Sequence, residues 1–117
     1  RMPKESDEQK SLRKAAITEA TKRATLEPFS VLERAIPSLE LAARVAEKGN
    51  QNSLSDAGVA ARMAHSAAIG AYYNVLINLS GIDDKKWCED VKSRATAIVK
   101  KADELASKIR GEMLEKL

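Results

Sequence analysis

Apolar residues recur at spacings of three and four along most of this 117-residue chain, and that periodicity constrains its fold. The clearest run lies near the C-terminus and contains Trp87, Val91, Ile98, Ala102, Leu105 and Ile109. This spacing places the side chains on one face of a long amphipathic helix that begins near residue 83 or 84. Aromatic residues form only 3% of the chain, which is little material for a β-sandwich or barrel. We therefore expect an all-α domain.

Two helical segments interrupted by proline are predicted in the first half of the chain. The first begins near Ser6, which has capping-box spacing to Gln9, and it ends or bends at Pro28. The second covers about residues 29–48 and is expected to kink or break near Pro37, because proline cannot donate to the helical hydrogen-bond ladder. Together with the later segments, these give a helical bundle of about four helices.

The next predicted segment is the central helix of this bundle. Gly49 stands where a left-handed C-terminal cap is expected, and residues 50–54 form a polar loop. Ser55 is a natural N-cap, and Asp56 in the first turn suits the helix dipole. The helix continues to about residue 78 and is apolar on most sides, which indicates that it is buried.

Polar residues on this helix share one side. Steps of about 100° per residue bring six positions to within about 40° of one line. These positions are Asp56, Met63, Ala67, Gly70, Asn74 and Asn78. Ala67 and Gly70 leave a shallow groove that admits a neighbouring backbone or a flat ligand. A buried polar group without a partner costs about 1–3 kcal/mol, so the stripe requires either internal hydrogen bonds or a ligand.

Each member of the stripe also has a structural explanation. Ser55 and Asp56 are residue types that helix starts favour, and Gly70 could serve close helix packing. The amides of Asn74 and Asn78 could bond the carbonyls that the two prolines leave free. The residues alone leave the choice between these roles open.

Charge and composition narrow the class of partner. Lys and Arg number 20 and Asp and Glu 17, but the basic residues alternate with acidic ones. Nucleic-acid-binding proteins usually gather basic residues on one stripe with stacking aromatics, so we expect no nucleic-acid partner. The apolar run Ala57–Leu79 is broken by Arg62, His65 and two asparagines, which makes it a poor membrane span. We expect a cytoplasmic protein with no membrane partner.

Residue types for metal or covalent catalysis are scarce. Cys88 is the single cysteine, so it forms no internal disulfide and no cysteine-based metal site. The neighbouring Glu89 and Asp90 should raise the pKa of its thiol. His65, the single histidine, is expected to be a satisfied core or interface residue. The sequence has no Ser-His-Asp set and no glycine-rich phosphate loop, and we expect no metal.

Two segments resemble the formimidoyltetrahydrofolate cyclodeaminase / methenyltetrahydrofolate cyclohydrolase family. Residues 49–61 read Gly-Asn-Gln-Asn-Ser-Leu-Ser-Asp-Ala-Gly-Val-Ala-Ala, and residues 70–79 read Gly-Ala-Tyr-Tyr-Asn-Val-Leu-Ile-Asn-Leu. The Met2-Pro3-Lys4 start and the Glu27-Pro28 pair are similar as well, so the likeness covers essentially the whole chain. Members of that family are longer, and their first half carries a Pro-Gly-Gly-Gly-Ser loop that is absent here. Residues 1–117 therefore resemble the C-terminal half of the domain.

The resemblance implies an all-helical homodimer that binds a tetrahydrofolate substrate and needs no metal. It implies a folate cleft in which Asp56 is the catalytic base or stabilises a cation, while Asn74 and Asn78 hold the substrate. Ser55 and Gly70 are the further substrate-binding candidates. The implied reaction is cyclodeamination of 5-formimino-tetrahydrofolate to 5,10-methenyl-tetrahydrofolate with release of ammonia. Two alternatives stay open: a methenyltetrahydrofolate cyclohydrolase on the same scaffold, or a catalytically silent helical dimerisation fragment.

Overall fold

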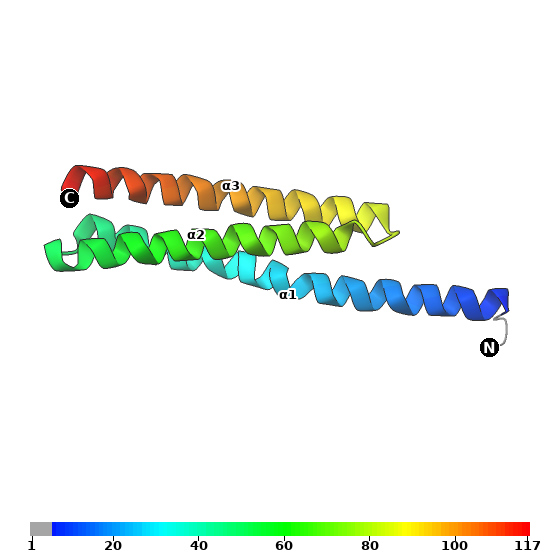
Figure 1. Ribbon diagram of the computed structural model, residues 1–117. Helices are drawn as coiled ribbons and strands as arrows, with labels where there is room; N and C mark the ends of the chain where they lie inside the picture. Colours follow the sequence, from blue (N-terminus) through cyan, green and yellow to red (C-terminus); the bar gives the residue numbers. More distant parts are fainter. Residues whose placement is uncertain (1–5) are drawn as a thin grey trace.

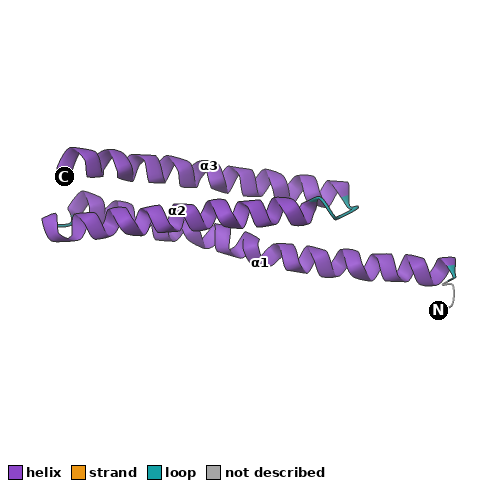
Figure 2. Ribbon diagram, in the orientation of Figure 1, coloured by secondary structure: helices purple, strands orange, loops and turns teal. Residues whose placement is uncertain are grey.

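A computed structural model describes residues 6–117, and this part of the chain folds into three antiparallel helices (Figures 1 and 2). Helix α1 comprises Asp7–Lys48, α2 comprises Gln51–Leu79 and α3 comprises Lys85–Lys116. No strand occurs among the described residues. The expected all-α class is confirmed, whereas the expected count of about four helices is wrong. Met2, Pro3 and Lys4 lie outside the described residues.

The count differs because the first two predicted segments form one helix. Pro28 and Pro37 both lie inside α1. A proline removes its own hydrogen bond to the carbonyl four residues earlier, but the bonds on either side can continue the helix. Phe29, Leu32 and Leu39 are buried on both sides of the second proline, so tertiary packing holds α1 together there. The predicted capping box between Ser6 and Gln9 is confirmed.

The connection between α1 and α2 is two residues long and differs from the expected loop. Gly49 is extended, with φ −71° and ψ 156°, so it is not the left-handed cap that we predicted. A Cβ at this position would clash with the Val45 carbonyl oxygen, and this close approach of the backbone explains the glycine. Asn50, rather than Ser55, is the N-cap of α2, and its side chain accepts the Ser53 N–H. Asparagine is as good an N-cap residue as serine. Because the cap lies at Asn50 instead of Ser55, α2 is longer than predicted by more than one turn.

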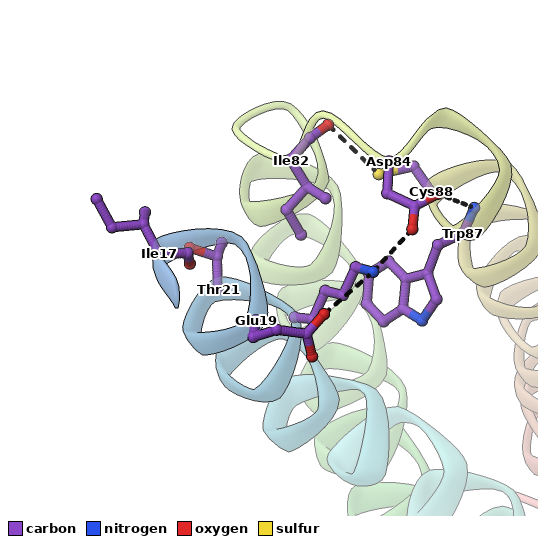
Figure 3. Close-up of polar contacts among 8 residues, drawn as sticks. Ile17, Glu19, Thr21, Ile82, Asp84, Trp87 and Cys88 are labelled. Carbon is purple, nitrogen blue, oxygen red and sulfur yellow. Dashed lines mark hydrogen bonds and ion pairs between the residues drawn. The ribbon is translucent and has the colours of Figure 1, made fainter. Parts of the chain in front are cut away.

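The start of α3 agrees with the sequence. Asp84 is the N-cap, and its carboxylate accepts the N–H of Trp87 at 3.1 Å. The same carboxylate pairs with Lys22 of α1 at 2.8 Å, and the Lys22 ammonium lies 5.3 Å from the centre of the Trp87 ring. Figure 3 shows Asp84 and Trp87 facing α1 at this junction. The contact ties the middle of α1 to the α2–α3 connection.

Cys88 is half-buried at the same end of the bundle. Its thiol lies within hydrogen-bond distance of the Leu79 and Ile82 carbonyls, and Figure 3 shows the contact with Ile82. Burial raises the pKa of the Cys88 thiol, and the charge of Asp84 adds to the rise. The predicted direction is confirmed, but its cause is the fold rather than the adjacent Glu89 and Asp90.

The core runs along the axis of the bundle, between the three helices. Its largest fully buried apolar side chains come from all of them and are Leu32, Leu39, Val75, Val91 and Ile109. Each such side chain contributes about 1.5–3 kcal/mol through burial. Helix α2 packs against α1 and α3, and the side that faces neither of them is exposed to solvent. The expectation of a fully buried central helix is therefore wrong.

The N-terminal part of α1 projects beyond the other two helices (Figure 1). Leu12 and Ile17 are exposed there, and Thr25 is the first fully buried residue along the helix. Lys14 pairs with Asp83 at 2.7 Å, which is one of the few links between this part and the α2–α3 connection. The projecting segment thus presents apolar side chains to solvent within the described structure.

Candidate functional site

A groove of about 430 Å³ lies between α1 and α2 and contains two of the predicted site residues. It is lined by Glu27, Pro28 and Val31 from α1 and by Ala67, Gly70, Ala71 and Asn74 from α2. Its volume falls within the range of small-molecule sites. This is the shallow groove that the small residues of the α2 stripe predicted, and its second wall is the region around Pro28.

Gly70 and Asn74 stand one turn apart on the floor of this α1–α2 groove. No described atom lies within 4 Å of a Cβ built on Gly70. The glycine therefore borders open space and does not serve close packing against another helix. Asn74 is exposed, and its amide makes no hydrogen bond to any other residue in 6–117. The amide therefore does not bond the carbonyls next to the two prolines, which was the structural alternative for this residue.

Glu27 is a groove residue that the sequence interpretation did not include among its candidates. Its exposed carboxylate comes from α1 and faces the groove that Asn74 lines from α2. A carboxylate accepts protons and hydrogen bonds, and an amide both donates and accepts. The sequence signal that could have found Glu27 was its position before Pro28 and four residues before Val31, on one helix face.

Asp56 and Ser55 lie far from this groove. Eighteen residues separate Asp56 from Asn74 on one helix, which corresponds to about 27 Å at 1.5 Å per residue. One small ligand on a single copy of the chain therefore cannot contact both side chains. Asp56 is exposed in α2 and does not line the α1–α2 groove.

Asn78 follows Asn74 by one turn and is half-buried near the end of α2. Its carbonyl accepts the N–H of Gly81 at 3.1 Å, which closes the turn after the helix. Its side-chain amide makes no hydrogen bond within residues 6–117. The structure thus places Asn78 beside the groove rather than among its lining residues.

Ser55 lines a second, larger groove of about 690 Å³ between α2 and α3. His65 lies in the same groove, and its Nε2 is 2.6 Å from the Asp103 carboxylate of α3. His65 is half-buried and paired across the two helices, so the expectation of a satisfied interface residue is confirmed.

Residues 6–117 contain no group of three or more His, Cys, Asp or Glu side chains arranged to hold a metal ion. In the same part of the chain, none of the helices combines the length and the apolar character that a membrane crossing requires.

Comparison with known proteins identifies the family. The model of the formiminotransferase-cyclodeaminase family matches residues 1–97, which is most of the chain. The chain belongs to this family. The resemblance of residues 49–61 and 70–79 to that family is thereby confirmed.

Individual relatives add detail. A protein of Methylorubrum extorquens named methenyltetrahydrofolate cyclohydrolase is 38% identical over 92% of this chain and 52% of its own length. The formimidoyltransferase-cyclodeaminase of Rattus norvegicus is 29% identical over 97% of this chain and 21% of its own length. That of Sus scrofa is 31% identical over 87% and 19%. The chain spans about half the length of the first relative and about a fifth of the others.

Proposed function

We propose that this chain is part of a folate-dependent one-carbon enzyme, a formimidoyltetrahydrofolate cyclodeaminase. The observation that carries the proposal is membership of the formiminotransferase-cyclodeaminase family. The α1–α2 groove supports it, because Asn74 and Glu27 offer an amide and a carboxylate to one small molecule. The substrate is 5-formimino-tetrahydrofolate and the products are 5,10-methenyl-tetrahydrofolate and ammonia.

The reaction consists of three events that groups of the protein can assist. N10 of the folate attacks the amidine carbon and loses its proton, the amidine nitrogen gains protons and leaves as ammonia, and a cation develops on the bridging carbon. A carboxylate near N10 serves as base and stabilises the cation. In this proposal Glu27 supplies that carboxylate in the α1–α2 groove, while the Asn74 amide, with Asn78 beside it, orients the pterin or amidine.

The position of Asp56 suggests a homodimeric site. The solvent-facing side of α2 exposes Val59, Met63, Tyr73 and Ile77, a row of large apolar side chains that a second copy could cover. A two-fold axis across this side makes the two α2 helices antiparallel. If the axis passes near position 65, midway between 56 and 74, Asp56 of one copy lies opposite Asn74 of the other. Asp56, with Ser55 next to it, would then act at the groove of the partner copy.

Methenyltetrahydrofolate cyclohydrolase is the second candidate. The relative of that name has a higher identity to this chain, 38%, than the cyclodeaminases at 29% and 31%. In this reaction water attacks the bridging carbon of the methenyl cation, so the same carboxylate and amide groups would serve. Neither reaction requires a change in the groove described above.

The test uses the full-length protein with 5-formimino-tetrahydrofolate, and it follows near-ultraviolet absorbance of the methenyl product together with ammonia. Equal amounts of both products support the cyclodeaminase. Hydrolysis of added methenyl-tetrahydrofolate without activity on the formimino substrate supports the cyclohydrolase. Absence of both activities in a folded protein would favour the silent helical fragment.

A mixing experiment tests the homodimeric site. We expect the Asp56→Ala and Asn74→Leu proteins each to have about a tenth of wild-type activity or less, and to recover roughly one quarter of it after joint unfolding and refolding. Half of the dimers are then mixed, and each mixed dimer has one intact site. If Asp56 and Asn74 served the same copy, mixing would restore nothing.

A further inference from the structure

Apart from Ser55, the residues that line the α2–α3 groove have no role in the proposed reaction, and the groove lies on another side of α2 than Gly70 and Asn74. Its floor is apolar and well packed, because Ile109 and Met113 are almost fully buried. Gly58 allows this packing: a Cβ there would lie only 2.8 Å from the Met113 sulfur. The groove is therefore a formed surface between two closely packed helices, with a volume in the range of small-molecule sites.

One end of this groove exposes large apolar side chains. Leu114 is 73% exposed and Leu117 is 71% exposed. Exposure of neighbouring large apolar side chains is unfavourable in water, so an apolar ligand that covers them is stabilised by their burial.

The middle of the groove carries uncompensated positive charge. Arg62 of α2 and Arg110 of α3 both line it, and neither forms an ion pair within the described residues. The carboxylate that lines the same groove, Asp103, is already paired with His65 at 2.6 Å. Two guanidinium groups thus remain available to an anion, and guanidinium groups bind carboxylates through paired hydrogen bonds.

The order of these groups along the groove gives the ligand a direction. Helices α2 and α3 are antiparallel, with the Gln51–Lys116 contact at one end and the His65–Asp103 pair at the other. The arginines lie between the leucines and this pair. The fourteen steps along the helix from Gln51 to His65 span about 21 Å, enough for an extended chain of medium length.

We propose that the α2–α3 groove binds an amphipathic monocarboxylate, with its carboxylate on Arg62 and Arg110 and its apolar body on Leu114 and Leu117. This site is separate from the folate groove and does not depend on the proposed folate reaction. An acidic amphipathic helix of another protein is a different occupant, and the experiment below separates it from the carboxylate.

The experiment is a calorimetric titration of the full-length protein with decanoate below its micelle concentration, with decanol as the uncharged comparison. We expect decanoate to bind saturably and decanol to bind with an affinity that is lower by about tenfold or more. The Arg62→Gln/Arg110→Gln double variant should lose about tenfold in affinity for decanoate. The matched control Arg34→Gln removes an exposed arginine of α1 outside the groove and should leave the affinity unchanged.

Circular dichroism spectra confirm that each variant is folded, and a Leu114→Ser variant tests the apolar end separately. The proposal is overturned if decanoate does not bind, if decanol binds equally well, or if the double variant binds like Arg34→Gln. An acidic amphipathic peptide that binds through the same arginines, while decanoate does not, would assign the groove to a protein partner instead. Folate turnover is measured alongside, so a failed folate reaction leaves this test intact.

Discussion

At the scale of single residues, Asn74 and Glu27 face one groove from two helices, and neither side chain bonds another described residue. Asn74 lies on an exposed part of α2. A solvated polar side chain without an internal partner contributes little to the stability of the fold, so it can bind a ligand without any loss of stability. Stability and turnover should therefore separate at this residue.

The Asn74→Leu variant is the direct test. We expect the free energy of unfolding to change by no more than about 0.5 kcal/mol, as for most surface substitutions. Turnover of the folate substrate by the full-length protein should fall about tenfold or more, because an amide hydrogen bond to the substrate is lost. Thermal melts and methenyl absorbance measure the two quantities, and Asn52→Leu on the same helix is the control. A large fall in melting temperature with normal turnover would assign Asn74 to the fold.

Gly70 allows a second separation of stability from activity. A Cβ at Gly70 meets no described atom, and the same is true of Gly111 in α3. Alanine in place of glycine inside a helix stabilises by about 0.5–1 kcal/mol. Both Gly70→Ala and Gly111→Ala should therefore raise the melting temperature.

Only Gly70→Ala should also raise the KM for the folate substrate, since Gly70 lies in the α1–α2 groove and Gly111 does not. Steady-state kinetics of both variants measure this difference. Equal KM values in the two variants would remove Gly70 from the site.

At the scale of elements, the long helix α1 depends on tertiary contacts. Two internal prolines each remove a hydrogen bond, yet buried residues such as Leu32 and Leu39 anchor the helix against α2 and α3. Lys108 of α3 pairs with Glu47, and Lys116 donates to the Ala46 carbonyl, so α3 also holds the C-terminal end of α1.

The two prolines should respond differently to replacement. Pro37 is exposed and lies outside the α1–α2 groove, so Pro37→Ala restores a backbone donor and should stabilise the protein by about 1–3 kcal/mol without changing turnover. Pro28→Ala also restores a donor, but Pro28 lines the groove and turnover should fall. Denaturant unfolding and kinetics of the pair test this. A destabilised Pro37→Ala protein would show that the proline conformation itself is needed.

At the scale of the whole molecule, ion pairs at the surface connect residues that are distant in sequence. Lysine hydrogen bonds and charges lower the pKa of Asp83, Asp84 and Glu47 in the folded chain. The same pairs raise the pKa of Lys14, Lys22 and Lys108. These links join the α2–α3 connection to the N-terminal half of α1, and the C-terminal half of α3 to the end of α1.

Acid should weaken these connections. A carboxyl group whose pKa is lower in the folded state stabilises the protein above its unfolded pKa of about 4, and that stabilisation is lost as the pH falls through the folded value. We therefore expect the melting temperature to fall as the pH drops below about 4, less steeply in high salt. The Asp84→Asn variant should flatten this pH dependence, whereas Glu104→Gln, which changes an exposed carboxylate without an ion pair in the described chain, should not. Identical pH profiles for the two variants would contradict the assignment.

The parts of the fold that could be predicted are those set by local chemistry. The all-α class, the capping box at Ser6 and the N-cap at Asp84 all follow from spacing and from side chains that bond the nearest backbone. The start of α2 at Asn50 was missed because Ser55 is an equally good local cap, and the burial of Leu54 and Ala57 supports the longer helix.

The groove was partly predictable. Gly70 and Asn74 share one face of α2, and helical geometry alone shows that. Glu27 belongs to another helix more than forty positions away, so its place opposite them depends on how α1 packs on α2. The separation of Asp56 from Asn74 by about 27 Å was available from the sequence, but a common helix face does not reveal a common site.

The sequence by itself determined the helical class, the approximate extent of α3 and, through its motifs at residues 49–61 and 70–79, the family. Periodicity and capping act within a few residues, so they can be read without the tertiary structure. Only the tertiary structure decided that α1 continues through two prolines, that one side of α2 stays exposed, and that Glu27 lines the same groove as Asn74. These outcomes depend on which buried surfaces from distant segments fit together, and that free energy of packing exceeds the local cost of a proline.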